Sequence, residues 1–198
     1  MRTKLSRAIL ESLQKPTVLT LKISDEDRET FYSELLEFSR KIGRNILILS
    51  SIYRGTGKPY ISESNIIRAF NSVLTSLNPP VARLFAGLDF QNVAKLLDTC
   101  YTLAIENYDK QCAELYRALS YLIESISKEP TVQGEVSTLN TCPPDNITLF
   151  LLLEALNNQT QGHPAIVVID CPLQRYDPAI LNKHLTTTRN LNPIILLE

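Results

Sequence analysis

Two short segments of this 198-residue sequence hold residues that could do chemistry. The first is Arg54-Gly55-Thr56-Gly57-Lys58, in which backbone N–H groups and a lysine could together hold a phosphate. The second is Asp170, which follows the apolar run Ile166-Val167-Val168-Ile169. An acidic residue at the carboxyl end of a buried parallel strand is well placed to hold magnesium-bound water. Together they suggest a site for ATP and magnesium, with Lys58 on phosphate and Asp170 on the metal.

Neither segment is a complete motif. The pattern GxxxxGK[ST] requires glycine and a hydroxyl residue at positions where this chain has Ile52 and Pro59. The first turn and the magnesium-binding hydroxyl are therefore missing, and Cys171 stands where a catalytic acid would follow Asp170. A plain glycine-rich turn and a degenerate, non-hydrolytic unit are the simpler interpretations. We therefore favour a protein that is not an enzyme.

The four cysteines form no CxxC pair and no Cys/His cluster with zinc spacing. We expect reduced and mostly buried thiols. Cys171, Asp170 and His184 could in principle form a thiol site, because a neighbouring imidazole lowers the pKa of a cysteine. Nothing in the sequence fixes their geometry, and Cys171 precedes a proline, so we prefer a structural cysteine.

The longest periodic pattern is an apolar stripe that predicts one helix of about 29 residues, from Asp25 to Tyr53, with one buried face. It is formed by Phe31, Leu35, Phe38, Ile42, Ile46, Leu49 and Tyr53. The alternative is that Gly43 ends the helix and that residues 45–50 form a buried strand, because four consecutive aliphatic residues are also typical of strands.

The remaining patterns predict a mainly helical α+β protein. Helices are expected after Thr3, after Ser62 or Ser64, in a short segment after Pro79, as a hairpin over 89–127, and from Asp145. Residues 165–169 and 193–197, with a helix between them, predict a small parallel Rossmann-like strand-helix-strand unit. We expect a helical module over 1–128, a linker or long loop over 129–145, and an α/β unit over 146–198, which could pack as one domain with the first.

Residues 3–77 resemble a histone fold of the archaeal-histone or TATA-factor-associated type. The resemblance consists of a short helix from Thr3 to Leu13, a long central helix from Asp25 to Tyr53, and a loop with a third helix at 60–70. Tyr60 and Asn65 depart from the family pattern of threonine and aspartate. The resemblance implies obligate pairing with another chain as a homodimer or heterodimer, or with the hairpin. It also makes DNA a partner to test, through Arg2, Lys4, Arg7, Arg54 and Lys58.

Residues 163–198 resemble, more weakly, the Walker B region of P-loop ATPases. The matching features are the strand that ends at Asp170, the helix that follows it, and Arg189-Asn190-Leu191-Asn192 before the next strand. This resemblance implies the ATP and magnesium interpretation given above.

Charge and hydropathy limit the partners and the cellular compartment that the sequence predicts. Residues 1–58 hold eleven Lys/Arg and seven Asp/Glu, and the rest hold nine and fourteen. This asymmetry is far below the positive charge that drives strong nucleic-acid binding. The chain has no apolar run long enough to cross a membrane and no secretion signal, so a cytoplasmic or nuclear protein is expected.

Three functions follow, in this order. The first is a regulatory protein that acts through pairing of its helical module, with no cofactor and with DNA association as an open question. The second is a nucleotide-binding ATPase or a degenerate relative. The third is a receiver-like signalling domain in which Asp170 is phosphorylated.

Overall fold

The computed structural model describes residues 2–52, 61–127, 136–139, 142–160 and 163–198. Within these ranges the helices are α1 (Arg2–Gln14), α2 (Asp25–Ile42), α3 (Glu63–Leu77), α4 (Pro79–Phe85), α5 (Phe90–Glu106), α6 (Lys110–Ser127), α7 (Asn146–Gln159) and α8 (Pro178–Thr188). The strands are β1 (Val18–Leu21), β2 (Ile46–Ser50), β3 (Val136–Leu139), β4 (Ile166–Asp170) and β5 (Ile194–Leu197). The expected class, predominantly helical with a parallel sheet, is confirmed.

All five strands belong to one parallel sheet in the order β1-β5-β4-β2-β3. The strand-helix-strand unit expected near the C-terminus is present as β4, α8 and β5. The sheet is completed by strands from the first quarter of the chain and by β3. In the three central strands, β2, β4 and β5, every residue is buried, which explains their nearly unbroken aliphatic sequences.

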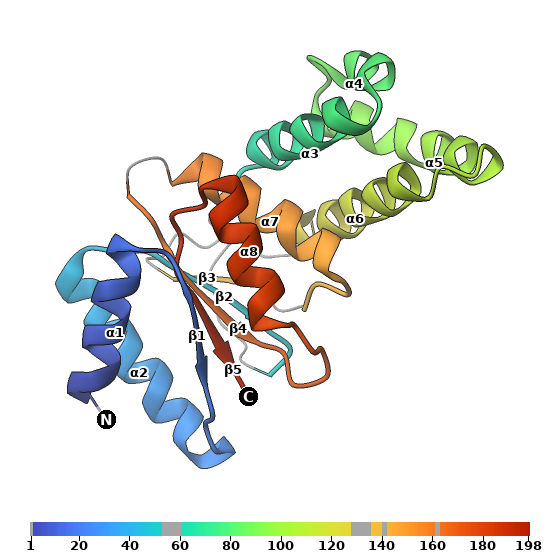
Figure 1. Ribbon diagram of the computed structural model, residues 1–198. Coiled ribbons are helices and arrows are strands. Elements are labelled where there is room, and N and C mark those ends of the chain that lie inside the picture. The colour runs from blue at the N-terminus through green and yellow to red at the C-terminus, as the bar shows by residue number, and fades with distance from the viewer. Residues whose placement is uncertain (1, 53–60, 128–135, 140–141, 161–162) are drawn as a thin grey trace. The chain divides into compact units, whose positions relative to one another are not determined.

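Helices cover both faces of this sheet (Figure 1). On one face α1 and α2 bury Ile9, Phe31 and Leu35 against side chains from β2, β4 and β5. On the other face α8 buries Leu181 and Leu185, and the side chain of its Asn182 accepts a hydrogen bond from the backbone N–H of Val18 in β1. Because side chains alternate along a strand, residues 166, 168 and 170 of β4 face α2.

The prediction of one continuous helix from Asp25 to Tyr53 is wrong. Helix α2 begins after its N-cap residue Ser24 and ends at Gly43, which adopts a left-handed conformation with φ of 64°. The backbone N–H of Arg44 donates to the carbonyl of Ser39, a hydrogen bond that closes the last turn of the helix. Residues 46–50 then form β2, as the alternative interpretation stated. Ile46 and Leu49 fit a helical spacing only by coincidence, since all five β2 residues are aliphatic or small.

The chain divides into two units that differ from the predicted domains. Unit 1 comprises residues 1–60, 129–142 and 160–198, and unit 2 comprises 61–128 and 143–159. The division after residue 128 coincides with a predicted boundary, whereas the divisions after residues 60, 142 and 159 do not. The N-terminal region contributes β1 and β2 to the sheet, and the expected linker contains β3. Helix α7, expected in the α/β unit, packs instead against α3 and α6.

Unit 2 is a helical bundle in which aromatic rings form part of the core. The ring centroids of Phe70 in α3 and Phe85 in α4 are 5.3 Å apart in an edge-to-face arrangement, and Tyr116 of α6 packs against both rings. Helices α3 and α5 are capped by side chains, since Ser62 accepts a hydrogen bond from the N–H of Asn65 and Asp89 accepts one from the N–H of Asn92. The expected helical hairpin is formed by α5 and α6.

Candidate functional site

The carboxyl ends of β2 and β4 lie side by side at the switch point of the sheet, where the connections from two neighbouring strands run in opposite directions. From β2 the chain continues to β3 on one side, and from β4 it continues to β5 on the other. In open α/β sheets, ligands bind outside the carboxyl ends of the two strands at such a switch point. The last residues of these strands, Ser50 and Asp170, are register partners and both are fully buried.

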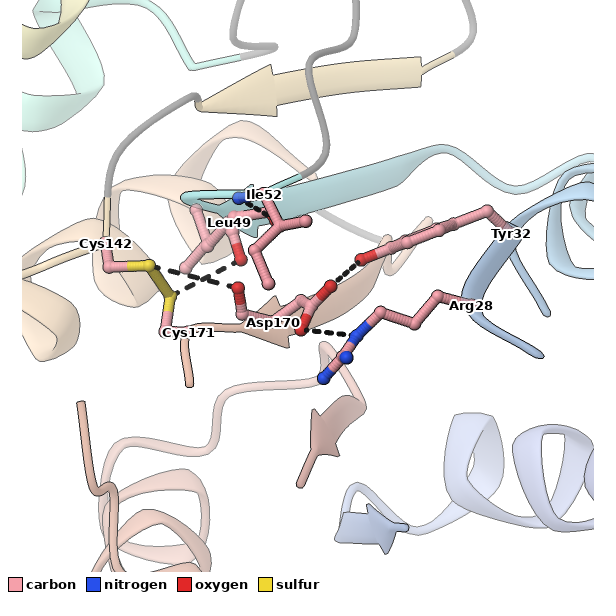
Figure 2. Close-up of a disulfide and its surroundings, with 8 residues drawn as sticks. Arg28, Tyr32, Leu49, Ile52, Cys142, Asp170 and Cys171 are labelled. Atoms are coloured by element: carbon pink, nitrogen blue, oxygen red, sulfur yellow. Dashed lines mark hydrogen bonds and ion pairs between the residues drawn. A yellow bond between two sulfur atoms is a disulfide. The ribbon is translucent and has the colours of Figure 1, made fainter. Parts of the chain in front are cut away.

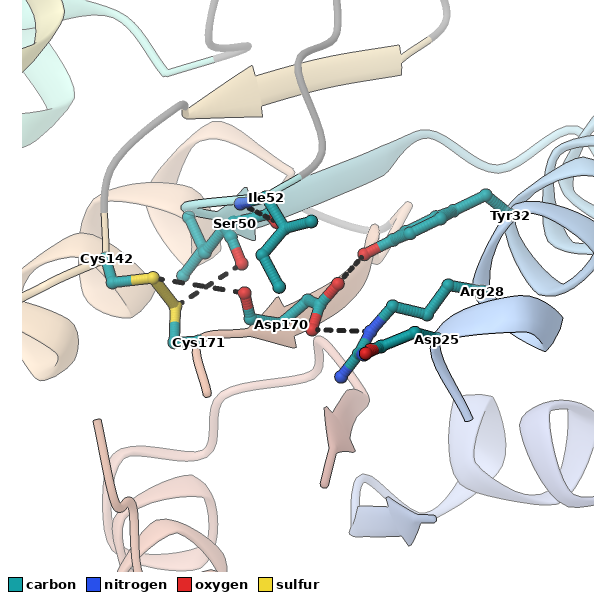
Figure 3. Close-up of polar contacts among 9 residues, drawn as sticks. Asp25, Arg28, Tyr32, Ser50, Ile52, Cys142, Asp170 and Cys171 are labelled. Atoms are coloured by element: carbon teal, nitrogen blue, oxygen red, sulfur yellow. Dashed lines mark hydrogen bonds and ion pairs between the residues drawn. A yellow bond between two sulfur atoms is a disulfide. The ribbon is translucent and has the colours of Figure 1, made fainter. Parts of the chain in front are cut away.

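A polar cluster on the α2 face occupies this position (Figure 3). The Tyr32 hydroxyl donates to Oδ2 of Asp170 at 2.7 Å, and Nε of Arg28 donates to Oδ1 at 3.3 Å. Nη1 of Arg28 also pairs with Asp25, which is exposed. Ser50 accepts a hydrogen bond from the backbone N–H of Ile52. Both carboxylate oxygens of Asp170 are therefore engaged by side chains of α2.

Burial and the neighbouring carboxylate both keep Tyr32 protonated. Desolvation raises the pKa of Tyr32 well above its ordinary value, and the hydrogen bond to Asp170 raises this pKa further. A hydrogen bond from Ser50 and the positive charge of Arg28 act in the opposite direction but are weaker. Tyr32 is consequently a fixed hydrogen-bond donor to Asp170 rather than a proton-transfer group at neutral pH.

A disulfide lies on the other side of the same strand ends (Figure 2). Cys142 and Cys171 are bonded, with their Cα atoms 5.8 Å apart. The Cys171 sulfur is 3.5 Å from the carbonyl oxygen of Leu49 in β2, and the Cys142 sulfur is 4.0 Å from that of Asp170. The expectation of reduced thiols is wrong for this pair, whereas Cys100 and Cys112 are free. The pairing needed the sheet to bring together residues that are 29 positions apart.

The disulfide also excludes the thiol site considered for Cys171, Asp170 and His184. A sulfur bonded to Cys142 cannot act as a nucleophilic thiolate. Cys171 is 3% exposed, and the strand alternation points its side chain away from the α2 face toward which Asp170 points. The preferred interpretation, a structural cysteine, agrees with this geometry.

The glycine-rich segment lies outside the described residues, and so do its predicted contact residues Arg54, Gly55, Gly57 and Lys58. The structure does describe β2, the strand that precedes the glycine-rich segment. The segment begins four residues after Ser50, the last residue of β2. The chain therefore enters this segment from the carboxyl end of β2, beside Asp170.

The residues predicted to form a pairing surface lie mostly inside the protein. Phe31, Leu35, Ile46 and Leu49 are at most 2% exposed. Phe38 and Ile42 are partly buried and pack against the same core, and Tyr53 lies outside the described residues. The stripe therefore covers the sheet of its own chain, and the histone-fold resemblance loses the long central helix on which it depended.

The described residues do not offer a magnesium site at Asp170. Magnesium requires near-octahedral coordination by oxygen atoms, usually with several waters. Both Asp170 oxygens already accept hydrogen bonds, one of them from a guanidinium, and the residue is fully buried. No group of three His, Cys, Asp or Glu side chains that could hold a metal occurs in the part of the chain that the structure describes. The same burial also keeps a phosphate donor away from Asp170, against the receiver-like interpretation.

Sequence reasoning found Asp170 but missed its partners. Arg28 and Tyr32 are spaced by four residues on α2, so they lie on one face of that helix, but nothing local indicates that this face reaches the end of β4. Within the described ranges, no helix is long and apolar enough to cross a membrane. Comparison of the chain with family models, curated proteins and solved structures finds no match.

Proposed function

We propose that the α/β unit is a Rossmann-like module that binds a nucleotide or another phosphate-bearing ligand without hydrolysing it. The observation that carries this proposal is the switch point between β2 and β4. Parallel α/β sheets bind ligands at this place because strand carboxyl ends and the loops that leave them surround an open crevice there.

The sequence that follows β2 supports a phosphate-bearing ligand. Gly55 and Gly57 have no Cβ, so their backbone N–H groups can approach a phosphate closely, and Lys58 supplies positive charge. In phosphate-binding loops a segment of this composition directly follows a strand of a parallel sheet. The strand assignment of residues 46–50 therefore favours the nucleotide hypothesis over the pairing hypothesis.

The polar cluster supports binding without hydrolysis. A hydrolytic site needs a carboxylate that can hold a metal or its water, and Asp170 is instead committed to Arg28 and Tyr32. The chain also has proline at position 59, where a hydroxyl residue would contact magnesium. We therefore expect binding that does not require magnesium.

A thermal-shift titration with ATP tests the proposal. It is performed with and without magnesium, on the oxidised protein and on the protein reduced with a phosphine. Ligand present at 100 times its Kd stabilises the folded state by about 2.7 kcal/mol, and we expect a shift of this kind in at least one redox state. The shift should be the same with and without magnesium.

The matched variants are Lys58→Ala and Lys183→Ala, which each remove one lysine. Lys183 lies on the exposed side of α8, so its loss should leave the shift unchanged, whereas Lys58→Ala should remove most of it. Absence of any shift at millimolar ATP in both redox states, with inorganic pyrophosphate equally inactive, would rule out the proposed function. A shift that requires magnesium would contradict the expected magnesium-independent binding.

A further inference from the structure

The Cys142–Cys171 disulfide crosses the carboxyl end of β2. In the sheet β2 lies between β3 and β4, and Cys142 and Cys171 follow those two flanking strands. Strands separated by one intervening strand lie about 9.5 Å apart. The Cα atoms of the two cysteines are only 5.8 Å apart, so the crosslink spans less than the distance between the two flanking strands.

The sulfur atoms lie against backbone carbonyl groups at the carboxyl ends of β2 and β4, where the proposed function places the ligand. The Cys171 sulfur touches the carbonyl oxygen of Leu49, and the Cys142 sulfur lies against that of Asp170. Figure 2 shows the disulfide beside the ends of both strands, opposite the Arg28 and Tyr32 side chains. At the carboxyl edge of the sheet, the polar cluster around Asp170 therefore lies on one side of the strand ends and the disulfide lies on the other.

We propose that this disulfide is a redox gate for the candidate ligand site, closed when oxidised and open when reduced. The inference rests on the proposed function, because it concerns access to the same strand ends. Reduction by a cellular dithiol breaks the S–S bond, transfers two electrons and two protons to form two thiols, and leaves the reductant as a disulfide. Cys142 is the more exposed of the two cysteines, so we place the attack of the reductant at its sulfur. Reduction removes the covalent bond that ties Cys142 to Cys171 beside the end of β2.

The remaining cysteines provide a matched control. Cys100 on α5 and Cys112 on α6 are free thiols of unit 2. A Cys142→Ser/Cys171→Ser double variant removes the gate, whereas Cys100→Ser/Cys112→Ser removes two thiols and keeps it. Alkylation followed by mass spectrometry should find two free thiols in the oxidised protein and four after reduction.

The experiment is calorimetric titration of the full chain with ATP in both redox states. If the closed form predominates by about tenfold when oxidised, the apparent affinity rises about tenfold on reduction. The Cys142→Ser/Cys171→Ser variant should bind like the reduced protein under both conditions, and the control variant should keep the redox dependence. Circular dichroism checks that each variant is folded.

The possible outcomes separate the two proposals. Equal affinity in both redox states would overturn the gate and leave nucleotide binding intact. Tighter binding by the oxidised protein, or four alkylated thiols before reduction, would also overturn it. Absence of binding by the reduced protein and by the double serine variant would reject nucleotide binding, and the gate with it. Amide hydrogen exchange gives a readout that needs no ligand, because reduction should lower the protection of residues 49–52 if the crosslink holds the end of β2.

Discussion

The hydroxyl of Tyr32 donates a 2.7 Å hydrogen bond to Asp170, although 138 residues separate them in the sequence. Tyr32 lies on α2 and Asp170 ends β4, so this bond joins the helix that covers one face of the sheet to the carboxyl edge. Together with Arg28 it satisfies both oxygens of a carboxylate that is fully buried. The pair therefore defines Asp170 as a positioning residue for α2 and not as an open metal ligand.

Tyr32→Phe should destabilise the protein without disturbing its packing. The substitution removes one hydroxyl and leaves a buried carboxylate oxygen without its donor, which costs about 1–3 kcal/mol. Urea denaturation followed by circular dichroism measures the free energy of unfolding. The control is Tyr101→Phe, because Tyr101 is 40% exposed and its hydroxyl should contribute little. Equal stabilities of the two variants would contradict the buried contact.

Asp170→Asn should also be destabilising, since it leaves the guanidinium of Arg28 with a neutral partner. The Arg28 side chain is 13% exposed, and loss of one partner of a buried pair costs about 3–5 kcal/mol when no other charge compensates. Asp25 remains as a partner of Arg28, so we expect a smaller loss of about 2 kcal/mol. Asp98→Asn, on the exposed side of α5, is the matched control.

The sign of the Asp170→Asn effect distinguishes two roles. Carboxylates kept for function are commonly strained, and removing them often stabilises the fold. A gain in stability, or no change, would show that Asp170 is held there for a ligand or metal instead of for Arg28 and Tyr32. A loss supports the structural role assigned here.

Local signals in the sequence predicted where these helices begin, because caps act over a few residues. Ser24, Ser62 and Asp89 each accept a hydrogen bond from the backbone N–H three residues later, at the helix starts that their residue types predicted. By contrast, β3 has only four residues in a segment with several prolines, and its identity depends on pairing with β2. A strand of this length has too little periodicity to be recognised alone.

The candidate site was only half predictable for the same reason. Asp170 could be found because it ends an aliphatic run that had to be a strand. Its contacts with Arg28 and Tyr32 span 142 and 138 residues, and the disulfide depends on the strand order. None of these relationships leaves a local pattern, so the order of the strands had to be known first.

Stability should fall at alkaline pH, in part through Cys112. Burial, reinforced by a hydrogen bond to Asp109, raises the pKa of Cys112 from 9.0 to about 12. Above pH 9 the thiol ionises in the unfolded state but stays protonated in the native state. This ionisation lowers the free energy of the unfolded state relative to the native state. The stability linked to Cys112 is therefore fully present below pH 9 and is lost as the pH rises toward 12.

The check is the urea midpoint of the wild type and of Cys112→Ala at pH 7.5 and at pH 10.5. The variant lacks the titrating thiol, so its midpoint should fall less between these pH values. Native protein at pH 8.5 should also be alkylated more slowly at Cys112, which is 2% exposed, than at Cys100, which is partly exposed. If the urea midpoints of the two proteins fell equally between the two pH values, and if Cys112 and Cys100 were alkylated at equal rates, the buried environment of Cys112 would be contradicted.

Substitutions at Gly43 test the turn on which the whole fold of unit 1 depends. Its φ of 64° is costly for a residue with a Cβ, so Gly43→Ala should lower the free energy of unfolding by about 1–2 kcal/mol, even though the added Cβ would meet no atom within 4 Å. Asparagine tolerates this conformation, so Gly43→Asn should lower the free energy of unfolding by clearly less than Gly43→Ala. In a continuous helix from Asp25 to Tyr53 the sign would be opposite, because alanine inside a helix is more stable than glycine by about 1 kcal/mol. Denaturation of the two variants therefore decides between a helix that ends at Gly43, with β2 beside β4, and the single long helix that the apolar stripe suggested.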